Sequence, residues 1–360
     1  SRIVPDLDVP VAVKMCGSRN RHHLWRRELS LRSQCRAHRG RDSMASVPAD
    51  TLFVAAIVGA TGTGKSQVAL EVAIRLGGTI ISADSMQVYK GMDIGTSKIP
   101  IAERRGIPHA LIDVVSPRHR FSVAEYQKLA TDAIMETYVS GRLPILVGGT
   151  GLYIRAVLDG YEFLPERPNA NLRSSLRRLP KSELRLQLAT VDPVAAEEIA
   201  VNDVRRLERA LEMHIQSGKL PSVLKRRQHG VTWRSVRIGL RCDRRDLYRR
   251  LDERVDAMRA HGMEAEVRGL LAQGLSMDDT AMQGIGYKEL VGWMCGGIGY
   301  EEAIRLWKQR TRNYAKRQET WFKKESGITW IDVTDRTLSD IACEVTDIIM
   351  GNAAWGCHEK

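Results

Sequence analysis

The run Gly59-Ala-Thr-Gly-Thr-Gly-Lys-Ser66 fits the pattern G-x-x-x-x-G-K-[ST]. Before it lies an apolar stretch, residues 52–58 (LFVAAIV), which indicates a buried strand. After it, residues 67–76 carry apolar side chains at Val68, Val72 and Leu76, the spacing of an amphipathic helix. In such a strand–loop–helix unit the glycines let successive N–H groups point inward at phosphate oxygens, and the helix N-terminus adds partial positive charge. The sequence therefore predicts a site for a di- or triphosphate, and leaves the molecule open.

Two side chains of this run have predicted roles of their own. Lys65 is expected to reach a terminal phosphate, and the Ser66 hydroxyl is expected to be a ligand of Mg²⁺. The alternative is a glycine-rich turn that binds nothing. The match at every position, within the strand and helix context, favours the phosphate site.

The composition limits the class of protein. The chain of 360 residues is long enough for two domains or for one domain with an insertion, and 43% of its residues are hydrophobic. It holds no apolar run of about 18 residues, so no membrane span is expected. Its six cysteines show no C-x-x-C spacing, which argues against a zinc site or a disulfide scaffold and suits a reducing cytosol.

The positive charge is spread over two parts of the chain. The formal net charge is +12, of which residues 1–43, with ten Lys/Arg and four acidic residues, contribute +6. The remaining +6 on residues 44–360 favours a polyanionic partner. We interpret residues 1–43 as a disordered or non-native N-terminal extension. The alternative is a mitochondrial transit peptide, because this stretch is rich in arginine and poor in acidic residues.

Alternating strands and helices follow the glycine-rich loop. Residues 78–83 (GTIISA) and 143–147 (LPILV) indicate buried strands, which end in Asp84 and in Gly148-Gly-Thr150. Residues 121–138 indicate a helix with Ser122 as N-cap and Glu125 at the capping-box position. This alternation predicts a parallel sheet that binds ligands at the C-terminal ends of its strands. Lys65, Asp84 and Thr150 are therefore expected to meet in one crevice.

The character of the chain changes near residue 165. Residues 169–228 are helical in pattern and rich in arginine, and residues 236–240 (VRIGL) return to a strand. Helical patterns over 247–273, broken by Gly262, and over 300–324 come next. We predict an α/β fold: a P-loop parallel-sheet core with a helical insertion domain and C-terminal helices. The expected parts are core (44–165), helical insertion (166–230), core with basic helices (231–335) and tail (336–360).

The helix expected over 300–324 carries Trp307, Tyr314 and Trp321 at seven-residue spacing, so they share one face. Such a stripe is more often core than a platform for stacking bases. Its basic flank is dense enough to favour an RNA backbone as counterpart. The cations are Arg305, Lys308, Arg310, Arg312, Lys316, Arg317, Lys323 and Lys324.

Seven motifs in order resemble the tRNA dimethylallyltransferase family. They are the loop at Gly59, the segment Asp84 to Lys98 (DSMQVYKGMDIGTSK), Gly148-Gly-Thr-Gly-Leu-Tyr153, Asn202-Asp-Val-Arg-Arg206, the pattern Arg244-x-x-Leu-Tyr-x-Arg250-Leu-x-x-Arg254-Val-Asp-x-Met258, Gly284-Ile-Gly-Tyr-Lys-Glu289 and Lys316-Arg-Gln-Glu-Thr-Trp321. The likeness runs from about residue 52 to about residue 332. Each motif is weak alone, and the ordered set is very specific.

The resemblance implies a reaction and its two substrates. A dimethylallyl group would pass from dimethylallyl diphosphate to N6 of the adenosine on the 3′ side of the anticodon, in tRNAs that read codons beginning with U. The phosphate loop would then hold a diphosphate leaving group, whose developing charge N–H donors, Lys65, Mg²⁺ and arginines would stabilise. The implied partners are the tRNA anticodon stem-loop and dimethylallyl diphosphate, with Mg²⁺ as cofactor.

The resemblance also implies catalytic roles for Asp84, Thr61 and Arg244. Asp84 would accept a hydrogen bond from the adenine N6 and act as general base. From the residues alone, an aspartate that binds Mg²⁺ or a substrate hydroxyl, as in similar P-loop kinases, is an equal alternative. The implied diphosphate-binding residues are Gly59, Ala60, Thr61, Gly62, Thr63, Gly64, Lys65, Ser66, Arg244 and Arg250.

For tRNA, the resemblance points to three segments and two isolated residues. An adenine in a stacked loop cannot present N6 to a crevice, so extrusion of the base is expected. Gly284, Gly286 and Tyr287 could equally form a turn between helices with a packed tyrosine. The implied tRNA-binding residues are Asp84, Ser85, Met86, Gln87, Thr150, Arg173, Asn202, Asp203, Val204, Arg205, Arg206, Gln283, Gly284, Ile285, Gly286, Tyr287 and Lys288.

Two departures from the family pattern bear on these expectations. Ala60 stands where family loops have proline, which affects loop stiffness. The tail lacks the Cys/His spacing of the zinc finger that eukaryotic members often append, which favours a bacterial-type cytoplasmic enzyme, expected to be a monomer, over mitochondrial import. The alternatives are a P-loop kinase or NTPase, an adenylate isopentenyltransferase that uses free AMP, and a non-catalytic RNA-binding protein. Intact Lys65, Ser66 and Asp84 argue against the last of these.

Overall fold

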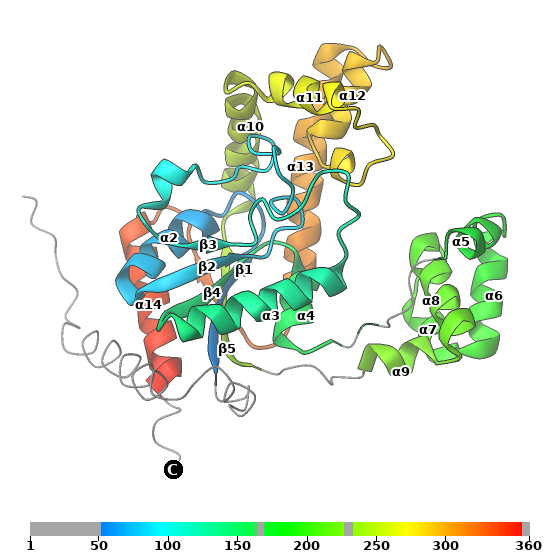
Figure 1. The fold of residues 1–360 in the computed structure, drawn as a ribbon, viewed down its shortest axis with the longest axis horizontal. Helices are drawn as coiled ribbons and strands as arrows, with labels where there is room; N and C mark the ends of the chain where they lie inside the picture. The colour runs from blue at the N-terminus through cyan, green and yellow to red at the C-terminus, as the bar shows by residue number, and fades with distance from the viewer. Residues whose placement is uncertain (1–51, 162, 164–168, 227–232, 355–360) are drawn as a thin grey trace, which may run out of the picture.

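A six-stranded parallel sheet forms the centre of the computed structural model, which describes residues 52–161, 163, 169–226 and 233–354. The strand order is β3-β2-β4-β1-β5-β6, and all pairs are parallel. The α/β class predicted from the sequence is confirmed (Figure 1). The strands are β1 (Phe53–Gly59), β2 (Gly78–Ser82), β3 (His109–Ala110), β4 (Leu143–Gly148), β5 (Arg234–Arg241) and β6 (Ile328–Asp332).

Helices cover both faces of the sheet. Residues 53, 55 and 57 of β1 pack with α2 and α14, whereas residues 54, 56 and 58 pack with α3 and α4. Because β1 is buried on both sides, its sequence is apolar throughout, as is usual in parallel sheets. The helices of this part are α2 (Lys65–Leu76), α3 (Val123–Val139), α4 (Gly151–Leu158) and α14 (Leu338–Ala354), with the 3-10 helix η3 (Ile101–Arg104).

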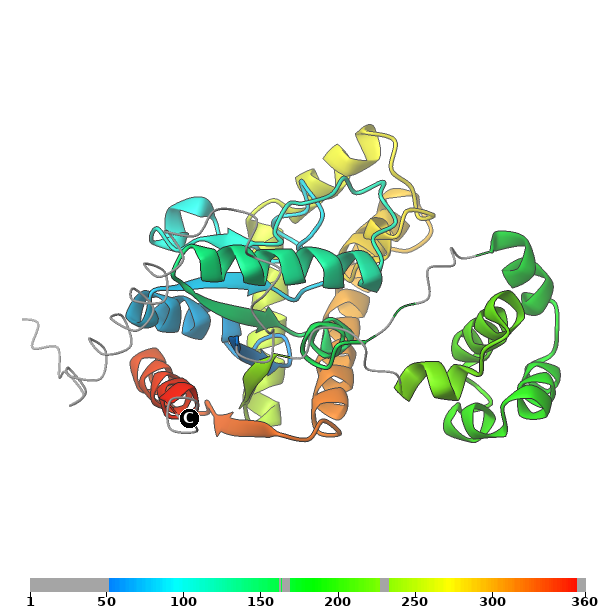
Figure 2. The ribbon, with the colours of Figure 1, turned by 60° about the horizontal axis from the view of Figure 1, so that its bottom comes forward.

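A second cluster of helices stands above one end of the sheet (Figures 1 and 2). Its apolar core joins these helices to the segment around Tyr89. The longest helix, α13, extends from this cluster to the sheet, where Phe322 is buried. The elements are α10 (Arg244–Ala260), α11 (Met263–Ala272), the 3-10 helix η4 (Ala281–Gln283), α12 (Tyr287–Met294) and α13 (Tyr300–Phe322).

The predicted helical insertion has an apolar core of its own. That core consists of side chains from α5 to α8, such as Leu184 and Leu211. Figure 1 shows these helices as a group set apart from the sheet. They are α5 (Ala170–Arg177), α6 (Lys181–Val191), α7 (Pro193–Glu198), α8 (Val204–Ser217) and α9 (Pro221–Arg226). Among the described helices of the whole chain, none combines the length and apolar character needed to cross a bilayer.

Most predicted elements agree with the structure, including the capping box of Ser122 and Glu125 at the start of α3. The sequence analysis predicted a tail over 336–360 with no helix, but residues 338–354 form α14, which packs against α2. The reason is an apolar stripe that includes Ile341, Val345 and Ile349, which joins the core beside α2. Strands β3 and β6 were also missed. The extension over 1–43 lies outside the described residues, and the other boundaries between parts stay predictions.

The arrangement of strands creates one crevice. Strands β1 and β4 are neighbours, with Val58 paired to Gly148, but the helices that follow them lie on opposite faces of the sheet. Such a reversal opens a crevice at the C-terminal ends of the two strands. The next strand, β2, ends at the same level, since Ser82 pairs with Val147. The loop at Gly59, the residues after Gly148 and Asp84 therefore begin at one edge.

The close approach of β2 and β4 at this edge gives a first prediction. A Cβ atom at Gly148 would lie far closer to the Ala83 carbonyl oxygen than a van der Waals contact allows. We expect Gly148→Ala to lower the free energy of unfolding by about 1–3 kcal/mol, because backbone must move. The matched control is Gly269→Ala in α11, where a Cβ meets nothing within 4 Å and should stabilise by about 0.5–1 kcal/mol. Urea unfolding measures both, and equal effects would contradict the packing argument.

Candidate active site

The phosphate loop takes the shape that its glycines allow. Gly62 has φ +86°, and a Cβ there would lie 2.8 Å from Leu251 of α10, so this position needs glycine. Thr63 Oγ1 and Lys65 Nζ both donate to the Ala60 carbonyl oxygen, at 2.9 and 2.5 Å. The N–H groups of Gly62, Thr63 and Gly64 have no hydrogen-bond partner among the described residues. The loop thus presents consecutive free donors beside a lysine, the arrangement of an anion site.

Lys65 occupies a place that disfavours its charge. Burial, together with the nearby Arg254 charge, lowers the pKa of Lys65 to about 7, against the opposite effect of Asp84. An anion placed between Lys65 and Arg254 would replace their repulsion by two attractions and favour the charged lysine. The site is therefore built to gain from an anionic ligand.

Arg254 reaches the loop from α10. Its Nη1 donates to Thr61 Oγ1 at 3.2 Å. Burial lowers the pKa of Arg254, and Asp84 acts in the opposite direction. Leu247 and Leu251 of the same helix pack against the Gly62 position, and Arg254, three residues beyond Leu251, shares their face.

The two arginines predicted for the diphosphate lie elsewhere on α10. Arg244 is exposed at the first position of the helix. Arg250 is half-buried and lies close enough to Cys242 to oppose the rise that burial causes in the pKa of that thiol. Among the described residues, neither arginine has a hydrogen bond to the loop, so their diphosphate roles stay predictions. The sequence analysis missed Arg254, although its spacing from Leu247 and Leu251 was a usable signal.

Asp84 follows β2 and faces the same crevice. Its Oδ1 accepts the N–H of Met86 at 2.8 Å, and the neighbouring Ser85 N–H donates to Thr150 Oγ1 at 3.1 Å. The Asp84 charge acts on the pKa of both Lys65 and Arg254. The structure thus brings together Lys65, Asp84 and Thr150, as the strand ends predicted.

Tyrosines line the Asp84 side of the crevice. The rings of Tyr126 and Tyr153 stack with centroids 3.8 Å apart, and Tyr126 donates to the Ser82 carbonyl oxygen at 3.0 Å. Burial and the Asp84 charge raise the pKa of Tyr314 to about 12, while a hydrogen bond with Thr150 opposes that rise. These neutral aromatic rings give the carboxylate an apolar surrounding, in which charge interactions are strong.

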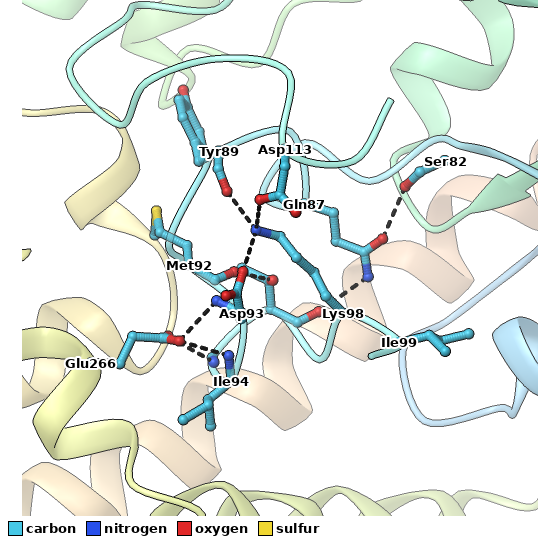
Figure 3. A network of polar contacts seen from close by, with 12 residues as sticks. Ser82, Gln87, Tyr89, Met92, Asp93, Ile94, Lys98, Ile99, Asp113 and Glu266 are labelled. Atoms are coloured by element: carbon cyan, nitrogen blue, oxygen red, sulfur yellow. Dashed lines mark hydrogen bonds and ion pairs between the residues drawn. The ribbon is translucent and has the colours of Figure 1, made fainter. Parts of the chain in front are cut away.

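The segment from Asp84 to Lys98 is held by a polar network (Figure 3). The Lys98 side chain is only 4% exposed, and its Nζ donates to the Tyr89 carbonyl oxygen, Asp93 and Asp113 at 2.5 to 2.7 Å. Gln87, predicted to bind tRNA, accepts from Ser82 Oγ at 3.0 Å and donates to the Thr96 carbonyl oxygen at 3.2 Å. Its amide therefore stabilises the turn in this structure.

Glu266 of α11 ties this segment to the predicted tRNA segment at 283–288. Its carboxylate accepts the N–H groups of residues 93, 94 and 95 at 2.8 to 3.1 Å, and the Tyr287 hydroxyl at 2.6 Å. Tyr287 is buried, and a Cβ at Gly284 would lie 2.6 Å from Met86. The packed turn considered for Gly284, Gly286 and Tyr287 is thus present, while Gln283 and Lys288 are exposed.

The predicted tRNA residues of the insertion lie on α5 and around the start of α8. Arg173 donates from Nε and Nη2 to the buried Glu212, at 2.9 and 2.8 Å. Burial would raise the pKa of Glu212, but its bonds from Arg173 and Arg209 lower it. Asp203 is the N-cap of α8 and accepts the Arg206 N–H at 3.3 Å; Asn202 accepts from Lys181, and Arg205 is exposed.

The eight cations predicted for the helix over 300–324 divide into two groups; Lys323 and Lys324 follow the end of α13, and the other six lie on it. Arg312 pairs with Asp252 of α10 at 2.6 Å, and Lys308 pairs with Asp256 at 2.7 Å. On each helix the two partners are four residues apart, so both pairs lie along one line of contact between α10 and α13. Arg310 pairs with the buried Glu289 of α12, and Arg305 pairs with Glu302 on its own helix. Among the described residues the other four have no carboxylate partner, and all are exposed: Lys316, Arg317, Lys323 and Lys324.

Comparison with known proteins gives a consistent set of relatives. A family model described as IPP transferase matches residues 87–325, and one described as isopentenyl transferase matches residues 52–113. The tRNA dimethylallyltransferase of Desulforudis audaxviator is 46% identical over 287 residues, covering 78% of this chain and 91% of the relative. That of Anoxybacillus flavithermus is 46% identical over 286 residues, covering 79% and 92%.

Solved structures agree with these relatives. The full-length tRNA isopentenylpyrophosphate transferase of Bacillus halodurans is similar with TM-score 0.66 and 40% identity, covering 85% of this chain and 98% of that one. A eukaryotic dimethylallyltransferase, solved while acting on tRNA, is similar with TM-score 0.70 and 32% identity, covering 79% and 74%.

The lowered pKa of Lys65 gives a second prediction. Between pH 7 and 10.5 the unfolded chain holds a proton that folded Lys65 has lost, so the free energy of unfolding rises with pH in this window. The rise from this group is up to about 1.4 kcal/mol for each pH unit. Lys65→Met removes this contribution. Urea unfolding of both proteins at pH 7, 8 and 9 should show a difference that changes steadily with pH, whereas parallel curves would mean an ordinary pKa for Lys65.

Proposed function

Because the chain belongs to the tRNA dimethylallyltransferase (IPP transferase) family, we propose that it transfers a dimethylallyl group from dimethylallyl diphosphate to N6 of an adenosine in tRNA. The adenosine is the one on the 3′ side of the anticodon in tRNAs that read codons beginning with U. The observation that supports this most is the meeting of Lys65, Arg254 and Asp84 in one crevice, where Arg254 and Asp84 both act on the pKa of Lys65, and Asp84 acts on that of Arg254. It provides a leaving-group site and a base side by side.

The phosphate loop is the proposed site of the diphosphate. As the allylic C–O bond breaks, negative charge grows on the diphosphate oxygens. The free N–H groups of Gly62, Thr63 and Gly64, with Lys65 and Arg254 beside the same loop, are proposed to stabilise that charge. Arg244 and Arg250, from the same helix, are proposed to complete the binding of the diphosphate.

Asp84 is the proposed general base. The new bond forms between N6 and the allylic carbon, and the proton that N6 loses passes to the carboxylate. Oδ1 is engaged by the Met86 N–H, so Oδ2 is the oxygen proposed to accept the proton. The nearby rings of Tyr126, Tyr153 and Tyr314 are proposed to exclude water from Asp84 when the adenine is bound, which would strengthen its contact with the amine.

Mg²⁺ fits this site as a companion of the diphosphate. Among the described residues no three His, Cys, Asp or Glu side chains gather into a metal site. Ser66 offers an exposed hydroxyl on the first turn of α2, and Mg²⁺ accepts few protein ligands when phosphate oxygens and water fill the rest. Ser66 would hold the ion, which would supply further charge neutralisation of the diphosphate.

The tRNA is proposed to lie over the open side of the crevice. Its adenine would be extruded toward Asp84, between Thr150 and the segment 84–87. The exposed cations Lys316, Arg317, Lys323 and Lys324 and the arginines of α5 and α8 are proposed to contact phosphates, since none of these four is engaged with a carboxylate of the described residues. We propose a monomer that works where tRNA is found, in the cytoplasm of a bacterial cell.

Asp84→Asn tests the general base. Asparagine keeps the shape and the oxygen that caps Met86, but it cannot take a proton. We expect transfer to fall by about 10²–10⁴-fold with tRNA affinity retained. Labelled dimethylallyl diphosphate and unmodified tRNA, followed by nucleoside analysis, measure transfer, and filter binding measures affinity. ATP consumption without RNA is the companion assay for a kinase. Normal turnover in Asp84→Asn would remove the assignment.

Arg254→Ala and Arg244→Ala form a matched pair on one helix. Loss of a charged contact to the diphosphate should raise KM for dimethylallyl diphosphate by about 10–100-fold, and we expect the larger effect for Arg254 because of its contact with Thr61. Arg254→Lys, which keeps the charge, should recover part of the loss. If either alanine variant changed only the affinity for tRNA, its diphosphate role would be wrong.

A further inference from the structure

A single buried side chain connects α13 with the phosphate loop. Gln318 accepts the Thr61 N–H at its Oε1, at 2.8 Å, and donates from Nε2 to the Gly149 carbonyl oxygen, at 2.9 Å. Both ends of the amide are therefore used, one on the loop after β1 and the other on the residues after β4. Tyr314, one helical turn earlier, hydrogen-bonds to Gln318 and to Thr150.

The space around this amide is closely fitted. A Cβ at Gly149 would overlap the Gln318 amide group and would also lie 3.3 Å from the Gly59 carbonyl oxygen. The amide thus fills the gap between the ends of β1 and β4, where the pairing of the strands has ended at Val58 and Gly148. Its two hydrogen bonds therefore connect the segments after β1 and β4 beyond the point where the strand pairing ends.

Thr61 is consequently held from two helices. Its backbone N–H is bound by Gln318 of α13, and its side chain accepts from Arg254 of α10. The next three residues are Gly62, Thr63 and Gly64, whose N–H groups are free. A shift of Thr61 would turn these donors away from a common point, and a cradle of N–H groups binds an anion only when they converge.

We propose that Gln318 is a positioning residue that sets the direction of the phosphate-loop donors, so that loss of its bridge weakens capture of the prenyl diphosphate and leaves tRNA binding unchanged. This inference rests on the proposed function, since it takes the loop as the diphosphate site. Gln318 would act through Thr61 and not by its own contact with a substrate.

The position of α13 does not depend on this amide. The pairs Arg312–Asp252, Lys308–Asp256 and Arg310–Glu289 hold the helix to α10 and α12, and Trp307 and Phe322, on its first and second halves, are buried. Removal of the bridge should therefore leave the helix, and the exposed cations on it, in place. If Gln318 positions the loop, its loss should weaken binding of the diphosphate alone. If Gln318 merely stabilised the fold, its loss should weaken binding of both diphosphate and tRNA.

Gln318→Leu and Gln318→Glu test the bridge. Leucine fills similar space without hydrogen bonds, and we expect KM for dimethylallyl diphosphate to rise about tenfold, with kcat and the Kd for tRNA within about threefold of the parent. The affinity for inorganic pyrophosphate, measured by calorimetry without tRNA, should fall by a similar factor. This second readout needs no transfer, so it tests the bridge even if the proposed reaction is wrong.

The glutamate variant adds a pH signature. A protonated carboxyl can accept from the Thr61 N–H and donate to the Gly149 oxygen as the amide does, whereas the carboxylate has no donor. The ratio of KM between Gln318→Glu and the parent should therefore fall as the pH is lowered from 8 to 6. The same ratio for Gln318→Leu should stay flat, and taking ratios cancels the titration of Lys65 that both proteins share.

The outcomes separate the two ideas. Parent protein that binds pyrophosphate but transfers no prenyl group would refute the proposed function alone. Parental pyrophosphate affinity in Gln318→Leu, or a loss confined to tRNA binding, would overturn the bridge. Should Gln318→Leu fail to fold, Gln318→Glu decides: a KM ratio that does not change between pH 8 and 6 would also overturn it.

Discussion

The crevice is organised around two cations that are held close together without a counter-ion of equal charge. Lys65 and Arg254 come from segments nearly two hundred residues apart, and burial together with their mutual repulsion lowers the pKa of Lys65 to about 7. Asp84 offsets part of this cost. An electrostatic arrangement of this kind persists only because packing enforces it: Leu247 and Leu251 fix α10 against Gly62, and Lys65 is folded back onto the Ala60 carbonyl oxygen. A bound diphosphate would satisfy the charges that the fold leaves unsatisfied.

The long helix α13 explains how such a site stays rigid. Its Lys308, Arg310 and Arg312 pair with carboxylates of α10 and α12, so this part of its basic character stabilises the fold. Its second half keeps exposed cations toward solvent and sends Tyr314 and Gln318 into the crevice. One element therefore connects the surface proposed for RNA with the loop proposed for diphosphate. The same helix sequence had suggested RNA contact along its whole length, because charge alone does not tell which cations already have partners.

Sequence patterns predicted the buried strands, the loop and the capped helix, because each is decided by neighbouring residues. What they missed depends on contacts between distant segments. Strand β6 (ITWID) is an edge strand with only Ile331 well buried, and β3 has two residues, so neither gives a clear period. Arg254 could have been inferred from its helical spacing to Leu247 and Leu251, but choosing it over Arg244 and Arg250 needed the loop against which α10 packs. Likewise, nothing local indicates that Gln318 meets Thr61 across 257 positions.

The motif residues differ in how they can serve recognition. The exposed Lys288 is free to contact a partner and Gln283, also exposed, donates from Nε2 to the Met277 carbonyl oxygen, whereas Tyr287 is buried and bonded to Glu266. A buried tyrosine cannot contact a base, but its hydrogen bond to Glu266 can hold the backbone of residues 283–288 in place. Glu266 gathers three N–H groups of the 93–95 turn and the Tyr287 hydroxyl on one carboxylate, so the segment that begins at Asp84 and the turn at 283–288 cannot move independently. Two segments far apart in the sequence thereby present one surface, whose shape is set by the hydrogen bonds of Glu266 that join them.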